Sequence, residues 1–284
     1  MREIDRSSPC STEVLIERAG AAVARSVLRE LGGAYGRRVI VVVGKGSNGE
    51  DGKVAAKRLK RRGVRVQLIN ADETPKELPD VDLVIDAAYG TGLKRPYEAP
   101  STNSTVLSVD IPSGVDGHTG CSMGRPFKAK KTLTFNALKP GHVFSDGACL
   151  SGELEIADIG LDTSSLSCGL VTDDDVSSWI PSRSNESHKW KSACWVIAGS
   201  EGMEGAAILT VSAAQRAGAG YIRFSSPEVE IPKVPLEAVS FPVQTDFSID
   251  ENEMSRFKSF VIGPGLGRNP ELLNWIKELV SGLK

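Results

Sequence analysis

The sequence predicts an α/β protein built on a parallel sheet, and three apolar runs carry this prediction. They are VIVVVGKGSNGEDG at 39–52, VDLVIDAAYGTGL at 81–93 and TVLSVDIPSG at 105–114. Their apolar stretches are nearly continuous, as in strands buried on both faces of a parallel sheet. Ligands bind beyond the carboxyl ends of such strands, so residues 44–52, Asp86 and Asp110 should meet at one crevice. This combination predicts a small-molecule site, for a nucleotide together with a cation.

Length, charge and cysteine content narrow the class of protein. The 284 residues suffice for two domains, and a net charge of −2 gives no sign of a nucleic-acid or anionic membrane partner. The five cysteines are odd in number and widely spaced, without a Cys-x-x-Cys pair, which favours a reducing compartment. No segment approaches the roughly 18 apolar residues of a membrane span, and the N-terminus lacks a signal-peptide core. We therefore expect a cytoplasmic protein that binds neither nucleic acid nor membrane.

Helices and strands are predicted to alternate along the first 160 residues. Ser11 can cap a helix at 12–31, which carries an apolar stripe, and a second helix should run from about Lys53 to Gly63. Strands are expected at 39–43, 64–69, 81–85, 106–109, 133–135 and 154–157. This alternation implies right-handed βαβ units and a parallel sheet flanked by helices.

A second pattern begins after a stretch rich in Ser, Asp, Asn and Pro at about 161–188, which is typical of a linker or loop. Strands are predicted at 195–198, 221–224 and 260–262, with a helix at 206–217. Asn269 can cap a final helix with Pro270 at its first position. That helix has an apolar stripe of Leu272, Leu273, Ile276, Leu279 and Val280. With only about three strands before residue 284, we expect the second domain to be incomplete.

The glycine loop admits more than one interpretation. Residues 44–49 satisfy G-x-G-x-x-G between a strand and a helix, and Asp72 lies about where a dehydrogenase holds the ribose. A nicotinamide-dependent dehydrogenase is therefore one alternative. However, Asn48 and Asp51 place an amide and an acid inside the loop, where an acid disfavours a pyrophosphate.

Carboxylates at the same edge favour a bound cation instead. Asp86 and Asp110 each follow an apolar run, and little positive charge balances them. Asn, Asp and Ser oxygens are ligands that hard cations accept. The alternative for either acid taken alone is that it only caps the loop that follows.

Five ordered motifs across about residues 1–175 resemble NAD(P)H-hydrate epimerases. They are Met1-Arg2 with Asp5, Leu-Ile-Glu-Arg-Ala-Gly at 15–20, the loop at 44–52, Asp-Ala-x-x-Gly-x-Gly-Leu at 86–93 and Asp-Ile-Pro-Ser-Gly at 110–114. The resemblance implies a Rossmann-like, three-layer parallel-sheet domain at 1–175. It also implies that this domain interconverts the R and S forms of hydrated NAD(P)H, a damaged cofactor.

The same resemblance implies a set of site residues. A potassium ion would be held by Asn48, Asp86 and Ser113. The hydrated nucleotide would be contacted by Ser47, Asn48, Gly49, Glu50, Asp51, Gly90, Thr91, Gly92, Leu93, Lys94, Arg95, Pro96 and Asp110. Physical chemistry agrees, because a cation among oxygens and a backbone cradle for phosphates leave one carboxylate, Asp110, for proton transfer. Ser47 and Glu50 depart from the family's Asn and Gly, and Glu50 adds negative charge beside a phosphate.

The second half resembles the start of an ADP-dependent NAD(P)H-hydrate dehydratase, a ribokinase-like α/β domain. The motifs are His-Lys at 188–189, Ile-Ala-Gly-Ser at 197–200, Gly-Ala-Ala at 205–207, Ala-Gly-Ala-Gly at 217–220 and Gly-Pro-Gly-Leu-Gly at 263–267. The resemblance implies that Ala206 and Gly265 lie against the hydrated dinucleotide; the alternative is that small residues there only allow close packing. The family's Gly-Thr-Gly-Asp run, which carries an anion cradle and a catalytic Asp, does not occur in the sequence. We therefore expect a linker at 176–187, a truncated dehydratase domain at 188–284, and ADP-dependent dehydration only in a full-length chain.

The sequence thus predicts a cofactor-repair enzyme whose substrates are small molecules, hydrated NADH and NADPH. The main alternative is a non-catalytic nucleotide-binding module, suggested by Ser47, Glu50 and the incomplete second domain. A dehydrogenase is favoured less, because the glycine pattern alone supports it. The sequence leaves a homo-oligomer open.

Overall fold

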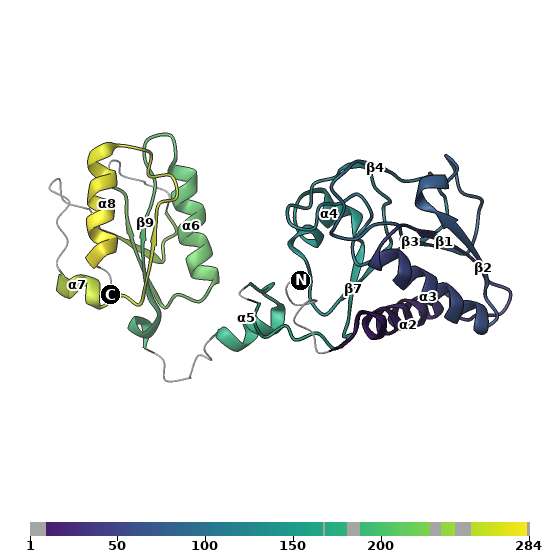
Figure 1. Ribbon diagram of the computed structural model, residues 1–284. Helices are drawn as coiled ribbons and strands as arrows, with labels where there is room; N and C mark the ends of the chain where they lie inside the picture. The colour runs from purple at the N-terminus through teal and green to yellow at the C-terminus, as the bar shows by residue number, and fades with distance from the viewer. Residues whose placement is uncertain (1–9, 167, 181–187, 228–233, 242–250, 283–284) are drawn as a thin grey trace. The chain divides into compact units, whose positions relative to one another are not determined.

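The computed structural model describes residues 10–166, 168–180, 188–227, 234–241 and 251–282. The motif at residues 1–5 and most of the linker predicted at 176–187 therefore lie outside the described residues. The chain forms two compact units, which meet in sequence between Thr172 and Asp173 (Figure 1). In the described ranges, no helix combines the length and the apolar character that crossing a bilayer requires.

The first unit is built on six parallel strands in the order β2-β1-β3-β5-β7-β8. The strands are β1 (Arg38–Val43), β2 (Arg65–Asn70), β3 (Leu83–Ala87), β5 (Val106–Val109), β7 (Lys131–Phe135) and β8 (Glu153–Ala157). The predicted parallel α/β architecture is confirmed. After β1 the chain forms β2 on one side of it and then β3 on the other. The topological switch point therefore lies beside β1. Ligand crevices in open α/β sheets occur at this position.

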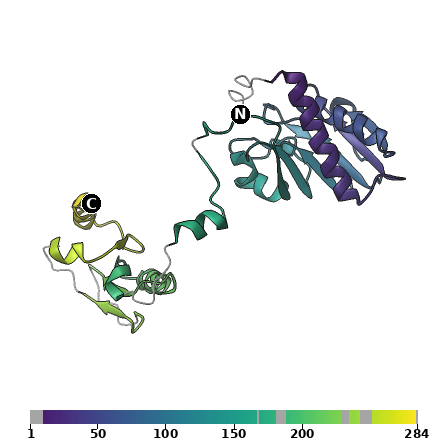
Figure 2. The same ribbon diagram turned by 90° about the horizontal axis from the view of Figure 1, so that it is seen from below.

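Two helices cover one face of this sheet. α2 (Thr12–Leu31) and α3 (Ser47–Arg61) lie together on it, and in Figure 2 the purple α2 crosses the strands. Ser11 stands at the N-cap of α2, but its side chain makes no capping hydrogen bond, so that part of the prediction is wrong. The other face is covered by irregular chain, where we expected helices, and by a ribbon of β4 (Tyr97–Glu98) and β6 (Gly124–Arg125). Short elements complete the unit: η1 (Ala71–Glu73), η2 (Pro140–His142) and α4 (Ser145–Leu150).

Helix α3 begins at Ser47, six residues before the predicted start at Lys53. The expected loop at 44–52 therefore shrinks to three residues. Its glycines are the reason, because they let the helix approach the sheet closely. A Cβ on Gly49 would lie 2.0 Å from the Gly44 carbonyl oxygen, and one on Gly52 would lie 2.5 Å from the Ala87 Cβ. Residues predicted to form a loop thus form the first turns of a helix that is buried on the side facing the sheet.

The second unit has four parallel strands in the order β11-β10-β9-β12. They are β9 (Ala193–Ile197), β10 (Tyr221–Ser225), β11 (Ala238–Ser240) and β12 (Ser259–Ile262), one strand more than expected. α6 (Glu204–Arg216) covers one face of the sheet, and α8 (Pro270–Gly282) with α7 (Glu251–Ser255) covers the other (Figure 1). α5 (Asp173–Trp179) and η3 (Lys189–Ser192) precede β9, so the region predicted as a linker contains a helix.

The last helix confirms its predicted cap but not its whole predicted stripe. The backbone N–H of Glu271 donates to Asn269 Oδ1 at 3.0 Å, as expected of an N-cap. Leu272, Trp275 and Leu279 are buried against the sheet, whereas Leu273 and Val280 are exposed. Residues three and four positions apart share a helix face, so Trp275 belongs to the buried stripe. Leu273 and Val280 each follow a residue of that stripe in sequence and therefore lie beside the stripe.

Candidate active site

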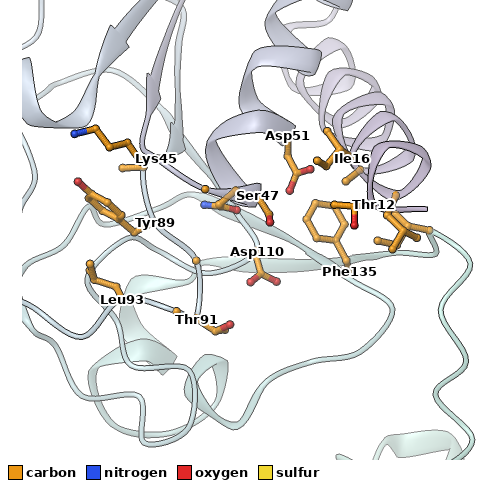
Figure 3. A pocket seen from close by; sticks show the side chains of 18 of the residues that line it. Thr12, Ile16, Lys45, Ser47, Asp51, Tyr89, Thr91, Leu93, Asp110 and Phe135 are labelled. Atoms are coloured by element: carbon orange, nitrogen blue, oxygen red, sulfur yellow. The ribbon is translucent and has the colours of Figure 1, made fainter. Parts of the chain in front are cut away.

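A pocket of about 1120 Å³ opens at the carboxyl ends of β1, β3 and β5 in the first unit (Figure 3). The turn into α3, the chain after β3, the start of α2 and residues beyond β7 form its walls. Of the predicted substrate residues it is lined by Ser47, Asn48, Asp51, Gly90, Thr91, Gly92, Leu93, Lys94, Arg95 and Asp110. Gly49, Glu50 and Pro96 are not among its lining residues. The crevice expected from the strand ends is therefore present, with most of the predicted contact residues around it.

The turn between β1 and α3 points the start of a helix at the pocket. Gly46 has a φ of 127°, in the region that favours glycine. A Cβ on Gly44 would lie 1.8 Å from the Ala88 carbonyl oxygen, so a glycine there lets the loops after β1 and β3 touch. The first backbone amides of a helix have no partner within the helix, and its dipole favours negative charge there. Ser47 and Asn48 thus stand where a phosphate group would be held.

Asp110 projects into the pocket from the end of β5 and forms an ion pair (Figure 3). Lys139 Nζ donates to Asp110 Oδ1 at 2.6 Å, and the two side chains are only 7% and 16% exposed. Thr134 Oγ1 accepts a second hydrogen bond from Lys139 at 2.6 Å and donates to Asp110 Oδ1 at 3.2 Å. Asp110 itself has a φ of 67°, which is unusual for a non-glycine residue. The surroundings therefore fix both the backbone and the carboxylate of this residue.

His142 forms hydrogen bonds with the backbone of both partners of this ion pair. Its Nδ1 accepts a hydrogen bond from the Lys139 backbone N–H at 3.0 Å. Its Nε2 is 2.7 Å from the Asp110 carbonyl oxygen and donates to it, because an acceptor there requires the proton on Nε2. Burial lowers the pKa of His142, which keeps the ring in this neutral form. His142 is therefore a positioning residue for the loop that carries Asp110.

The sequence analysis missed Thr134, Lys139 and His142. Thr134 lies near the end of β7, the fifth strand of the sheet, and Lys139 and His142 follow that strand. The rule that ligands bind beyond the carboxyl ends of strands covers this position too. The signal was therefore available in the run TFNALKPGH at 134–142. Nothing in the local sequence, however, pairs Lys139 with an acid that lies 29 positions earlier.

Asp51 brings a second carboxyl group to the same pocket. It lies on α3, is 6% exposed, and points toward the cavity in Figure 3. Burial, with the nearby negative charges of Asp110 and Glu50, raises the pKa of Asp51 to about 8. At neutral pH the Asp51 carboxyl is therefore protonated, while Asp110 forms the ion pair with Lys139. Two carboxyl groups in different protonation states can serve as an acid and a base.

The three predicted cation ligands lie around the turn after β3. Asp86 lies inside that strand and is completely buried, rather than open to the crevice. It accepts hydrogen bonds from Ser108 Oγ at 3.0 Å and from the backbone N–H and Oγ of Ser113 at 2.8 Å and 2.6 Å. Burial raises the pKa of Asp86, because the charged form loses its water. In the described part of the chain, no lysine or arginine forms an ion pair with it.

Asn48 supplies the observation that favours a bound cation. Both polar atoms of its amide are buried, and within the described structure neither has a hydrogen-bond partner. Buried polar groups are otherwise satisfied in proteins, so an orphaned amide oxygen indicates a missing ligand. An amide, a carboxylate and a hydroxyl oxygen are a donor set that suits a hard cation. The described residues contain no cluster of three or more His, Cys, Asp or Glu side chains for a transition metal.

Ala206 and Gly265, the two substrate contacts predicted in the second unit, lie side by side. A Cβ on Gly265 would be 2.9 Å from the Ala206 Cβ, so the turn after β12 sits directly on the start of α6. Ser200 Oγ donates to the Gly265 carbonyl oxygen at 2.7 Å and fixes that turn. The carboxyl ends of β9 and β12 thus bring these small residues together, and close packing alone accounts for their size.

Comparisons with known proteins agree with this division of the chain. Residues 12–80 and 70–141 match the family model described as YjeF-related protein N-terminus, and residues 194–283 match the NAD(P)H-hydrate dehydratase model. A protein of Thermofilum pendens named bifunctional NAD(P)H-hydrate repair enzyme Nnr is 30% identical over all of this chain and 64% of its own length. Its namesake in Escherichia coli is 32% identical over 82% of this chain and 53% of its own.

The chain thus combines a region that matches the YjeF-related N-terminus family with one that matches the NAD(P)H-hydrate dehydratase family, and relatives named bifunctional NAD(P)H-hydrate repair enzyme align with most of it. The relative from Moorella thermoacetica is 29% identical over 94% of this chain. The chain spans about three fifths of the length of these repair enzymes, 62% of the Moorella protein and 64% of the Thermofilum protein. A crystal structure of yeast YNL200c aligns with 55% of the chain at 20% identity and a TM-score of 0.43.

Proposed function

We propose that the first unit interconverts the R and S epimers of hydrated NADH and NADPH at C6 of the nicotinamide ring. The observation that carries this proposal is the Asp110–Lys139 ion pair at the floor of a pocket whose wall is a helix N-terminus. The helix supplies the binding of phosphates, and the ion pair supplies a fixed base. The match of residues 12–80 and 70–141 to the YjeF-related N-terminus family, and the names of the relatives, support the same chemistry.

The reaction needs one proton to leave and one to arrive. C6 of the hydrate carries a hydroxyl group and is bonded to the ring nitrogen. The Asp110 carboxylate removes the hydroxyl proton, the C6–N bond breaks to leave an aldehyde, and the electron pair moves to the nitrogen. Protonated Asp51 donates to that nitrogen. Rotation of the aldehyde and reversal of the proton transfers close the ring with C6 inverted, so the reaction consumes nothing.

Lys139 and His142 have the task of keeping Asp110 in place through this cycle. Lys139 uses its three donors on Asp110, Thr134 and the Phe135 carbonyl oxygen, so its ammonium group has little freedom to move. A base that is held in one geometry saves the entropy of finding it. We assign both as positioning residues for this reaction.

A potassium ion is proposed at Asn48, Asp86 and Ser113. The unpartnered Asn48 amide and the buried Asp86 carboxylate support it. When bound, the ion supplies positive charge that balances Asp86 and orders the turns around the substrate. Asp86→Ala should remove potassium dependence and most activity. A variant that is as active as the parent with and without potassium would exclude this site.

Asp110→Asn tests the reaction, because it keeps the shape and removes the base. We expect epimerisation to fall by about 10²-fold or more. The assay supplies the R hydrate with an independent S-specific dehydratase and follows recovery of NADH. Glu98→Gln, at an exposed acid paired with Arg125 outside the pocket, is the control and should leave the rate unchanged. Parent protein that binds the nucleotide without any turnover would instead identify a non-catalytic binding module.

The proposal for the second unit rests on its match to the NAD(P)H-hydrate dehydratase family. We propose that Ala206 and Gly265 face hydrated dinucleotide there, and that ADP-dependent dehydration requires the Gly-Thr-Gly-Asp run as well. Adding a segment with that run should confer dehydration of the S hydrate on the protein. The wide spacing of the cysteines, without a Cys-x-x-Cys pair, supports a cytoplasmic setting for both activities.

A further inference from the structure

A second, smaller pocket lies beyond the end of β2, next to the first. Its volume is about 390 Å³, and its walls are the turn after β1, the first turns of α3 and the residues that follow β2. Lys45 and Gly46 line both pockets, so the two cavities adjoin at the β1–α3 turn. The reaction described above uses only the larger one.

Asp72, in the wall of the smaller pocket, lies at the centre of a polar network whose other members, Lys45, Tyr89 and Arg95, line the larger pocket. Its Oδ1 accepts hydrogen bonds from Tyr89 Oη at 3.0 Å and Arg95 Nη2 at 3.2 Å, and Lys45 Nζ is 3.2 Å from its Oδ2. Arg95 also donates to Tyr89 Oη at 2.8 Å and lies over the Tyr89 ring. These donors lower the pKa of Asp72, which presents a carboxylate at neutral pH.

The position of Asp72 in the sheet is that of a ribose-binding acid. It lies in η1, directly after β2, and β2 is the neighbour of β1. In dinucleotide-binding sheets an acid at the end of the second strand accepts a hydrogen bond from the ribose 2′-hydroxyl. Asp110 follows β5, three strands along the order β2-β1-β3-β5, or roughly 14 Å at the usual strand spacing. The helix N-terminus between the two acids would hold the pyrophosphate.

We propose that Asp72 and the smaller pocket bind the adenosine ribose of the hydrated dinucleotide and make the enzyme prefer hydrated NADH to hydrated NADPH. This inference rests on the proposed function of the larger pocket. It assigns a binding site to the adenosine end of the substrate, where the reaction changes no bond.

The charges around Asp72 are the reason to expect a preference for hydrated NADH over hydrated NADPH. The charged residues that line the smaller pocket are Lys45, Lys53, Glu50, Asp72 and Glu73, which together carry one excess negative charge. A 2′-phosphate would bring two more negative charges against Asp72, whereas a hydroxyl donates to it. Lys45 is 94% exposed, and exposed ion pairs contribute little, so a ribose hydroxyl can replace its contact at small cost.

Asp72→Asn tests the proposal, with ADP-ribose and its 2′-phosphate as probes in calorimetric titrations. The parent should bind ADP-ribose about ten-fold more tightly than the phosphate, the usual value of a hydrogen bond to a charged group. The variant should lose that advantage, because Arg95 and Lys45 no longer have a carboxylate to neutralise and can contact the phosphate. Asp80→Asn, at an exposed acid outside both pockets, should keep the parent's preference.

The two proposals fail in different ways. If Asp110→Asn abolishes epimerisation but Asp72→Asn changes neither affinity, the ribose site is wrong and the reaction stands. If the parent shows no epimerisation but Asp72→Asn still reverses the preference, the ribose site stands and the reaction is wrong. A parent that binds the 2′-phosphate more tightly than ADP-ribose overturns the inference directly.

Discussion

The two units place the same local structure at the carboxyl edge of a parallel sheet but surround it with different charges. In each, a central strand ends at a glycine turn and a helix follows, β1 to α3 in the first unit and β9 to α6 in the second. In the first unit this edge carries the buried acids Asp51 and Asp86. Among the described residues of the second unit the buried polar side chains are Ser200, Arg223 and Ser225.

The two units therefore share the glycine turn, and among the described residues only the first unit adds buried acids at that edge. In the first unit a lysine approaches an acid that faces a cavity. In the second, Arg223 pairs with Glu253 and its guanidinium group lies 4.3 to 4.7 Å from the centres of the Trp195, Phe241 and Phe257 rings. Under the proposed function the first pair serves the reaction, whereas the second packs within an aromatic cluster.

Removing the lysine of the first pair is the strongest test of this contrast. Lys139→Met leaves Asp110 without its charge partner in a nearly dry site, so epimerisation should fall by about 10²-fold and the unit should lose about 3–5 kcal/mol of stability. Rate measurements and hydrogen exchange of each unit report the two effects. Lys139→Arg should recover part of the rate with a changed pH profile, which a residue that only stabilises the fold would not do.

The matched substitution in the second unit is Arg223→Met. It should lower protection of that unit from hydrogen exchange, because three aromatic rings lose their central partner, and leave the rate of epimerisation unchanged. A rate that falls equally in both variants would contradict the division of roles.

Glycine substitutions test how closely each helix approaches its sheet. Gly49→Ala would place a Cβ 2.0 Å from the Gly44 carbonyl oxygen, so α3 must shift at a cost of about 1–3 kcal/mol, and affinity for the nucleotide should fall with it. Gly205→Ala, near the start of α6, meets no atom within 4 Å and should stabilise that helix by about 0.4–1 kcal/mol. Thermal unfolding of the two variants checks the opposite signs. Equal destabilisation would show that α6 is packed as tightly as α3.

The pH dependence of stability should also differ between the units. Asp51 has a pKa of about 8 in the folded chain and an ordinary value of 3.8. Between these values the folded state keeps a proton that the unfolded state has lost, so its contribution is complete below about pH 4 and disappears as the pH rises through 8. Asp51→Asn should therefore raise the free energy of unfolding, relative to the parent, more at pH 8 than at pH 4.

Carboxyl groups elsewhere supply the control for that sign. The pKa of Asp146 is lowered, chiefly by the Ser122 backbone N–H, and that of Glu253 by Arg223 and Arg256, so each stabilises the fold above its ordinary pKa. Asp146→Asn should lose stability at high pH rather than gain it. Denaturant titrations at pH 4, 6 and 8 compare the variants, and a gain in both would exclude burial as the cause at Asp51.

Local sequence was sufficient for most of the sheets. The strand predicted at 106–109 coincides with β5, and those at 39–43, 133–135 and 221–224 each extend by no more than two residues. Short apolar runs of this kind are predicted well because burial on both faces leaves few polar positions in them. The predicted start of α3 was wrong for the opposite reason, since the two glycines and four polar residues at 47–52 are ordinary loop composition.

The sequence by itself determined that parallel strands end at one edge with glycines, an amide and several acids, because strand direction and turn chemistry are local properties. Only the tertiary structure decided what those acids can do. It paired Asp110 with Lys139, buried Asp51 and Asp86, left the Asn48 amide without a partner, and placed Asp72 among three donors. Protonation and partner choice depend on burial and on charges brought together from distant positions, and no window of local sequence contains those distances.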